Sequence, residues 1–168
     1  MRKPNSSVTH EKILYLLEYD PRTGIFIWKN PNAYQKSKKG CVAGRIDSGG
    51  YRQIAINKLR YGAHRLAWLY VHGRWPEGLI DHINLNKDDN RIENLRECSL
   101  SQNCCNRRKR SDNTTGFKGI FPENGKFRSE IVSCGERINL GSFETPEEAH
   151  AAYVAASLKY HGEFGRGN

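Results

Sequence analysis

The stretch "LIDHINLNKDDNRIENLRECSLSQN", residues 79–103, decides how the rest of the sequence is interpreted. Two short runs that contain apolar residues, "LID" and "NLREC", flank a loop rich in Asn and Asp, a composition typical of turns. The pattern predicts a hairpin with a long loop, followed by a helix from about Ser99 to Lys109. Asp81 and His82 stand where the first strand ends, so the stretch is either a polar turn alone or the place of a reactive centre.

The Asp-His pair offers chemical groups that phosphodiester hydrolysis needs. That reaction requires an activated water and charge stabilisation at the phosphate and the leaving oxygen, which a general base and a divalent metal supply together. The imidazole of His82, with an ordinary pKa of about 6.5, is largely neutral at pH 7 and can accept a proton. The oxygens of Asp81 and Asn103 form a hard half-site that suits Mg²⁺, with Mn²⁺ as the alternative. Turn chemistry alone explains three other asparagines: Asn84, Asn86 and Asn90.

The charge of the chain points to a polyanionic partner. Its 168 residues include 27 Lys and Arg against 18 Asp and Glu, which gives a net charge of +9. Aromatic side chains lie among the basic ones, and this mixture favours a folded nucleic-acid binder over a solvated basic tail. Ribosomal and RNA-binding proteins share the same profile, so charge alone leaves the partner open.

The cysteines and the apolar runs exclude several classes of protein. The number of cysteines is odd and no C-x-x-C pair occurs, which argues against a disulfide framework and a structural zinc site and predicts a reducing, cytoplasmic compartment. No apolar run approaches the roughly 18 to 20 residues of a membrane span, and the N-terminus lacks an apolar signal core. The cysteines are Cys41, Cys98, Cys104, Cys105 and Cys134.

Upstream of residues 79–103, apolar periodicity and turn residues predict four elements. They are a helix capped by Thr9 with Ile13, Leu14 and Leu17 on one face, a strand at "GIFIW" (24–28), a hairpin over 51–64 that turns at Asn57-Lys58, and a buried helix at "HRLAWLYVHG" (64–73) closed by Gly73.

The last third of the chain carries the clearest local signals. The segments "GFKGIF", "KFRSEIV" and "RINLGSF" are separated by Asn124-Gly125 and Gly135, which predicts a three-stranded antiparallel sheet. Thr145, Pro146 and Glu148 combine an N-cap, an N1 proline and a capping box, so a helix should start there and reach about residue 160. We expect this helix to cover one face of the sheet and to leave the other face open.

Between these two parts, residues 107–115, "RRKRSDNTT", have the composition of a linker. The predicted domains are therefore 1–106 and 116–168, with the core motif of the first at 79–106. The basic side chains of the linker should track phosphates and contribute affinity with little sequence specificity. They are Arg107, Arg108, Lys109 and Arg110.

The first domain resembles the HNH endonucleases, in particular phage and intron-associated homing endonucleases with the ββα-metal fold. The shared pattern is "DH", a loop of Asn and Asp, "NL", and an Asn on the next helix, and the likeness extends over residues 9 to about 110. The resemblance implies that His82 is the general base, that Asp81 and Asn103 are metal ligands, and that Asn94 is a catalytic-site residue that pins the loop. Many HNH enzymes carry His where this chain has Asn103.

Residues 116–168 resemble the APETALA-type, ethylene-response-factor DNA-binding domain, most clearly in "LGSFETPEEAHAAY" and "KYHGEF". The resemblance implies that the sheet enters the major groove. Arg can read guanine and Glu can accept from cytosine, whereas Lys can instead meet phosphate. Asn139 stands where the family usually has an aromatic residue, so sequence preference should differ or be loose. The matching contact positions are Lys118, Lys126, Arg128, Glu130 and Arg137.

These features predict an α+β chain: a ββα-metal nuclease domain preceded by a small β-rich region, and a three-stranded antiparallel sheet packed on one helix. The predicted function is site-directed cleavage of double-stranded DNA by a soluble monomer that uses one divalent metal and a histidine base, as in a phage homing endonuclease. One alternative is a non-catalytic DNA-binding regulator that retains an HNH scaffold. A structural RNA-binding protein is the other. His64 would either orient the site or pack in the core.

Overall fold

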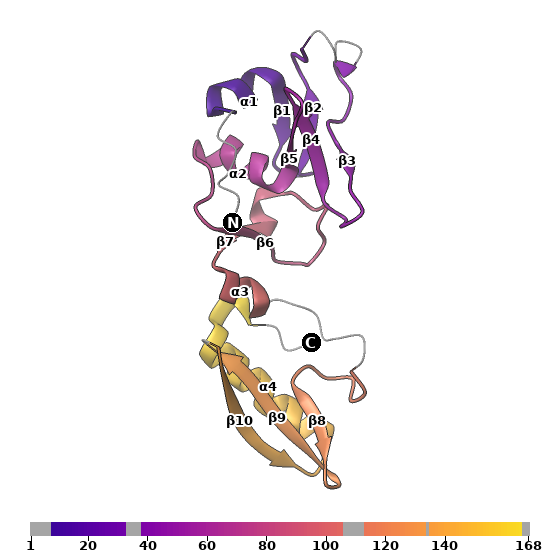
Figure 1. The fold of residues 1–168 in the computed structure, drawn as a ribbon, viewed down its shortest axis with the longest axis vertical. Helices are drawn as coiled ribbons and strands as arrows, with labels where there is room; N and C mark the ends of the chain where they lie inside the picture. The colour runs from indigo at the N-terminus through magenta and orange to yellow at the C-terminus, as the bar shows by residue number, and fades with distance from the viewer. Residues whose placement is uncertain (1–7, 33–37, 106–112, 134, 166–168) are drawn as a thin grey trace. The chain divides into compact units, whose positions relative to one another are not determined.

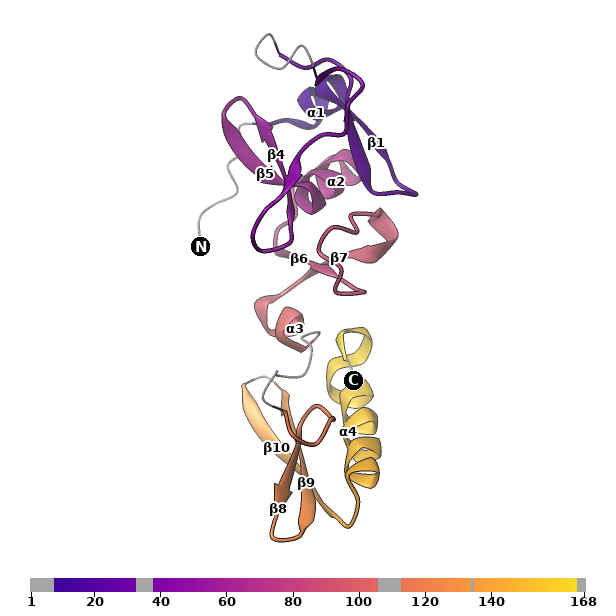
Figure 2. The same cartoon turned by 90° about the vertical axis from the view of Figure 1, so that its right-hand side faces the viewer.

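The computed structural model describes residues 8–32, 38–105, 113–133 and 135–165, and shows a mixed α/β chain with small sheets and a few helices (Figures 1 and 2). The chain divides into two compact units, Met1–Glu97 and Cys98–Asn168, and each is described by itself. Within the described ranges, no helix combines the length and the apolar character that a membrane span requires.

The first unit begins with a helix that leads directly into a strand. α1 (His10–Leu16) starts at Thr9, whose hydroxyl accepts a hydrogen bond from the amide of Lys12 at 3.2 Å. The helix ends earlier than its apolar pattern predicted. Leu17 belongs to β1 (Leu17–Asp20), which pairs antiparallel with β2 (Ile25–Trp28), the strand predicted at "GIFIW". Leu16, rather than the predicted Leu14, is the helix residue that is buried beside Ile13.

A second sheet follows, with the strand order β3-β4-β5. β4 (Arg52–Ile56) and β5 (Leu59–Gly62) form the predicted hairpin, and Asn57 and Lys58 turn it with φ values of 51° and 67°. Two consecutive residues with positive φ are the geometry of a two-residue hairpin turn. β3 (Arg45–Ile46) was not predicted, because a two-residue strand is too short to show an alternating pattern.

The predicted helix is α2 (Ala63–His72), which shares one apolar core with the strands of this sheet and ends at Gly73, which has a φ of 70°. Next in the chain, β6 (Leu79–His82) and β7 (Leu95–Cys98) pair as a two-stranded sheet, and a 3₁₀ turn (Ile92–Asn94) leads into β7. One apolar core joins α1, α2 and the strands of the unit. Its largest fully buried members include Ile13, Leu17, Phe26, Ile54, Ile56, Leu66 and Leu69, and Ile80 and Leu95 attach the small sheet to it.

The second unit begins with α3 (Leu100–Cys105), which lies inside the helix predicted from Ser99 to Lys109; residues 106–109 lie outside the described ranges. Its sheet has the order β10-β9-β8 and is antiparallel throughout. Figure 2 shows the long helix α4 along one face of this sheet. The elements are β8 (Ile120–Glu123), β9 (Lys126–Ser133), β10 (Glu136–Phe143) and α4 (Pro146–His161).

The start of α4 has the capping chemistry that its sequence predicted. The Thr145 hydroxyl accepts from the amide of Glu148 at 3.2 Å, and the Glu148 carboxylate accepts from the amide of Thr145 at 3.3 Å. β8 begins later than "GFKGIF" suggested, because Gly119 has a left-handed φ of 74° that interrupts an extended strand. Side chains from the sheet and the helix form the core: Ile120, Ile131, Ala149, Tyr153 and Ala156.

Candidate active site

Asp81 and His82 lie at the end of β6, and both side chains are buried, with 5% and 4% of their surface exposed. Their neighbour Ile80 belongs to the apolar core, so the strand that carries them is anchored to the body of the first unit. Buried charged and titratable groups need partners, because removal from water penalises an unpaired charge. The contacts of these two residues therefore define the chemistry of the site.

Asp81 forms an ion pair with Arg96 of β7, the neighbouring strand. The Nε and Nη2 atoms of Arg96 lie 2.9 Å and 2.8 Å from the Oδ2 atom of Asp81. The Arg96 side chain is itself 13% exposed, so this pair is largely removed from water. Arg96 holds the carboxylate in a fixed position next to His82.

The imidazole of His82 lies against Asn90, whose Oδ1 atom is 3.4 Å from Nε2. The Nδ2 atom of Asn90 donates to the carbonyl of Asp88 at 2.9 Å, and this bond directs Oδ1 toward the imidazole. Because an amide oxygen only accepts, Nε2 is the donor in this contact. The neutral ring that donates through Nε2 keeps its lone pair on Nδ1, where a proton can be accepted.

The environment of His82 favours its neutral form. Burial lowers the pKa of His82, while the contact with Asn90 and the charge of Asp81 oppose this shift. Desolvation penalises the charged imidazolium and outweighs those two effects. At pH 7 the ring is therefore neutral and able to act as a base.

Asn94 joins the two ends of the polar loop. Its Oδ1 atom accepts from the amide of Asn84 at 3.0 Å, its Nδ2 atom donates to the carbonyl of Asp89 at 2.8 Å, and its own carbonyl accepts from Ile83 at 2.9 Å. Asn94 is buried, with 6% exposed surface, and both its amide oxygen and its amide nitrogen bond to the loop. A direct catalytic role for Asn94 stays a prediction.

The rest of the first unit holds the same loop from outside. The Tyr19 hydroxyl donates to the carbonyl of Asn90 at 2.8 Å, and burial raises the pKa of Tyr19 to about 12. The guanidinium of Arg52, on β4, donates to both carboxylate oxygens of Asp88. Gly24 lies so close that a Cβ atom there would stand 2.5 Å from the amide nitrogen of Arg91. The N-terminal sheets and the loop are thus one structural body.

Two further rings surround His82. The ring of His64, in the first turn of α2, lies edge-on at a centroid distance of 5.3 Å, and the ring of Tyr51 lies 5.9 Å away. Burial lowers the pKa of His64 to about 3, so this second histidine is also neutral. His64 is half-buried and its ring borders that of the proposed base, so a role in orienting the site stays a prediction.

The predicted metal ligands fit a hard divalent ion by chemical kind. Mg²⁺ commonly takes only one or two protein carboxylates, with waters and substrate phosphates completing its shell. Asp81 supplies one carboxylate, and its Oδ2 atom already pairs with Arg96. No group of three or more His, Cys, Asp or Glu side chains placed to hold a metal occurs in the described ranges. Asn103 is half-buried in α3 of the second unit, so its joint use with Asp81 stays a prediction.

The predicted DNA-reading positions of the second unit lie on or beside the sheet face that α4 leaves open. Lys126, Arg128 and Glu130 alternate along β9 with buried Ser129 and Ile131, so they share that face. Three of the predicted readers already have acidic or basic neighbours on the sheet. Arg128 Nη1 lies 3.1 Å from Glu130 Oε1, and Lys126 Nζ lies 2.6 Å from Glu144 Oε1.

The remaining predicted positions are distributed differently. Arg137 is exposed on β10, opposite Val132 in the register with β9. Lys118 lies before Gly119 and outside β8, so it is not a strand residue. The linker residues Arg107, Arg108, Lys109 and Arg110 lie outside the described ranges. Their roles in DNA binding stay predictions.

Sequence reasoning missed the residues that position the site. Asn90 was assigned to turn chemistry, and Arg96 and Arg52 were assigned no role. One signal was available for Asn90, because it belongs to the segment "DNRIENLR" that carries the family resemblance. Arg52 precedes its partner Asp88 by 36 positions in the chain, and a local sequence pattern cannot predict a contact over that separation.

The segment that carries the candidate site is similar to a known protein family. Residues 61–104, from the end of β5 to α3, match the family model described as HNH endonuclease. This segment contains β6, the polar loop and β7, together with His64 and Asn103. Residues 61–104 are therefore similar to HNH endonucleases, and the buried Asp-His pair lies within the matched segment.

Two viral proteins are similar to the chain over about three fifths of its length. Protein 3.8 of Escherichia phage T7 is 29% identical over 106 residues, which cover 61% of this chain and 87% of that protein. An uncharacterized HNH endonuclease of Acanthamoeba polyphaga mimivirus is 30% identical over 107 residues, or 62% of this chain. That alignment spans 56% of the mimivirus protein, so the chain corresponds to about half of its length.

A third relative is similar over a short segment only. An AP2/ERF and B3 domain-containing transcription factor of Arabidopsis thaliana is 46% identical over 48 residues. The segment is 28% of this chain and 14% of the plant protein. No solved structure gives a significant match to the chain.

Proposed function

We propose that this chain is a DNA endonuclease that hydrolyses a phosphodiester bond, with His82 as the general base and Asp81 and Asn103 as ligands of one divalent metal ion. The free-standing homing type found in phages is the specific form that we propose. Support comes from the match of residues 61–104 to the HNH endonuclease model and from the viral relatives.

One observation carries the proposal: a buried, neutral imidazole is fixed beside a buried carboxylate at a strand end. His82 contacts Asn90 through Nε2, and a neutral imidazole that donates through Nε2 accepts a proton at Nδ1. Asp81 is fixed by Arg96 and cannot turn away from the site. Both side chains are buried, and each is held by a neighbouring residue of the loop or of the adjacent strand.

A divalent ion held by Asp81 and Asn103 would supply charge stabilisation at the phosphate and at the leaving 3′ oxygen. The chain itself supplies the base and its orientation. Asn94 keeps the loop closed around the base, because its amide group joins Asn84 and Asp89. Mg²⁺ is the ion that the oxygen donors suit best, and Mn²⁺ is the alternative.

We also propose that the second unit positions the nuclease on DNA through the open face of its sheet. The partial likeness to the plant AP2/ERF transcription factor supports this role, as does the row of Lys126, Arg128 and Glu130 on β9. An Arg and a Glu that pair with each other in the free protein can separate on DNA, where Arg contacts a guanine edge and Glu accepts from a cytosine.

Supercoiled plasmid incubated with and without Mg²⁺ tests the function. We expect nicked or linear product only with the metal, and a 10²- to 10⁴-fold slower reaction for His82→Ala, the usual range for removal of a general base. His72→Ala is the matched control, because His72 is an exposed histidine on the helix of the same unit. Tight DNA binding without cleavage under every metal condition would favour the non-catalytic regulator instead.

A further inference from the structure

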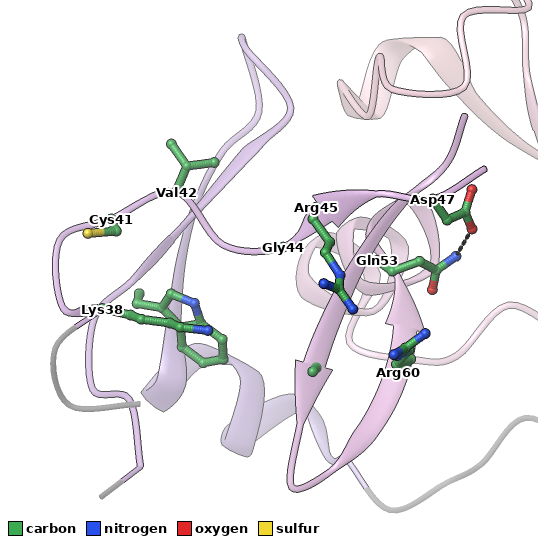
Figure 3. A pocket seen from close by; sticks show the side chains of 10 residues that line it. Lys38, Cys41, Val42, Gly44, Arg45, Asp47, Gln53 and Arg60 are labelled. Atoms are coloured by element: carbon green, nitrogen blue, oxygen red, sulfur yellow. Dashed lines mark hydrogen bonds between the residues drawn. The ribbon is translucent and has the colours of Figure 1, made fainter. Parts of the chain in front are cut away.

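A groove of about 570 Å³ lies on the first unit, away from the residues of the proposed active site. One wall is the segment 38–44 and the other is the outer face of the β3-β4-β5 sheet. Figure 3 shows Lys38, Cys41 and Val42 on the first side and Arg45, Gln53 and Arg60 on the second. Neither the family match nor the predicted sites include this groove as a unit.

The register of the sheet brings the polar residues of the groove together. Arg45 pairs with Gln53 across β3 and β4, and Ala55 pairs with Arg60 across β4 and β5. Ile54, between Gln53 and Ala55, is fully buried in the core, so the alternation of the strand directs its neighbours outward. The small side chain of Ala55 leaves space between the two guanidinium groups.

Main-chain hydrogen bonds fix the opposite wall. The amide of Ala43 donates to the carbonyl of Phe26 at 2.7 Å, and the amide of Trp28 donates to the carbonyl of Cys41 at 3.0 Å. Gly44, with a φ of 87°, then brings the chain against β4, where a Cβ atom would stand 2.6 Å from the Gln53 carbonyl oxygen. The position of this wall is therefore fixed by the backbone.

Its three cations have no side-chain partner among the residues that the structure describes. Lys38, Arg45 and Arg60 are exposed, and their side chains make no hydrogen bond or ion pair with any other residue in the described ranges. The one acid of the groove, Asp47, is already used: its carboxylate accepts from the amides of Gly49 and Tyr51 and from the Gln53 side chain. With three cations and one carboxylate among its lining residues, the groove has a net positive charge.

We propose that this groove binds backbone phosphates of duplex DNA, an inference that rests on the proposed endonuclease function. Exposed cations on an open surface suit a chain of phosphates, whereas a single small anion calls for an enclosed site. The same strand connects the groove to the proposed active site, because Gln53 lines the groove and the adjacent Arg52 binds Asp88 of the polar loop. DNA held here would be held by the body that carries His82.

Binding to a fluorescent DNA duplex, measured in a chelator that prevents cleavage and over 50–200 mM salt, tests the proposal. The Arg45→Ala/Arg60→Ala variant should bind on the order of tenfold more weakly, and its slope of log affinity against log salt should fall by about 1.8, since each phosphate contact contributes about 0.9. The Lys12→Ala/Arg22→Ala control removes two exposed charges outside the groove and should keep the wild-type slope. Circular dichroism and thermal melting confirm that both variants fold.

Cys41 provides an independent readout, because it is exposed and lines the groove. Duplex DNA should slow its alkylation, measured by peptide mass spectrometry, while buried Cys98 stays slow with or without DNA. Unchanged affinity and slope in the groove variant, or no protection of Cys41, would contradict phosphate binding by the groove. Neither result would contradict the proposed endonuclease activity. Failure of the wild-type protein to bind DNA at any salt concentration would overturn both proposals.

Discussion

Arg52 and Asp88 form a two-point ion pair in which Nε and Nη2 each donate to a different carboxylate oxygen at 2.8 Å. The pair joins β4, in the N-terminal sheet, to the polar loop that follows His82. Both side chains are partly shielded, with 19% and 30% of their surface exposed. The paired fork geometry fixes direction as well as distance. The loop that closes the proposed site is thus positioned by a strand about thirty residues earlier in the chain.

Arg52→Ala should therefore weaken cleavage more than DNA binding. Loss of a charge-assisted pair costs about 1–3 kcal/mol, and the loop that loses it carries the Asn90 contact to His82. Plasmid cleavage and duplex affinity, measured in parallel, separate the two effects. Arg52→Lys should recover little, because Lys lacks the planar fork. Equal losses of binding and cleavage would mean that Arg52 contacts DNA instead.

Asn90→Ala should lower the turnover rate by removing the acceptor that orients His82. We expect a smaller loss than for His82→Ala, because the base itself remains. Asn86→Ala is the control: Asn86 belongs to the same loop, but it is exposed and its side chain accepts only from the amide of Asp88. Single-turnover experiments measure the cleavage rate of both variants. Similar rates would show that the contact between Asn90 and His82 does not contribute to catalysis.

Arg96→Ala should destabilise the first unit by about 3–5 kcal/mol, the cost of leaving one member of a buried ion pair alone. The double variant Asp81→Asn/Arg96→Ala should recover part of that loss, because no charge then remains buried. Urea unfolding curves of the two variants measure the difference. A double variant less stable than Arg96→Ala would contradict this account.

The stability of the protein should decrease on acidification below pH 6.5 partly because of His64. Burial lowers its pKa to about 3 in the folded state, so between these values the unfolded chain binds the proton more readily. The resulting slope is at most about 1.4 kcal/mol per pH unit. His64→Phe should reduce the pH dependence of the unfolding free energy between pH 4.5 and 6.5. An unchanged dependence would show that His64 does not contribute to it.

Gly24→Ala should cost more than Gly40→Ala, although both glycines have left-handed φ values, 73° and 78°. At Gly40 nothing lies within 4 Å of an added Cβ atom, so only the backbone conformation is penalised, at about 1 kcal/mol. At Gly24 the new atom would also collide with the backbone of Asn90 and Arg91. Thermal unfolding should rank the two variants in this order, and Gly24→Ala alone should also impair cleavage.

Local chemistry made much of the fold predictable from sequence. The Asn57-Lys58 turn, the Gly73 helix end and the Thr145–Glu148 capping box each depend on residues within four positions of one another. The end of α1 was predicted wrongly, because Leu17 suits a helix face and a strand equally well. Its pairing with Trp28, eleven residues away, decides for the strand.

The sequence indicated the candidate catalytic residues, but it did not indicate the residues that hold them in position. Asp81 and His82 stand out as adjacent polar residues at a strand end, and Asn94 follows from the family resemblance. Arg96, Arg52 and Tyr19 serve the site through contacts that span 15 to 71 positions of the chain. Such contacts exist only after the core has formed, so neither spacing nor composition indicates them.

The contact between Tyr19 and Asn90 has a consequence for engineering. The segment that matches the HNH family begins at residue 61, yet the backbone of its loop is held by Tyr19 and closely covered by Gly24. A graft of residues 61–104 onto another protein would carry the proposed catalytic side chains without the surface that shapes their loop. We expect such a segment to keep its loop geometry only when β1 and β2, which carry Tyr19 and flank Gly24, are transferred with it.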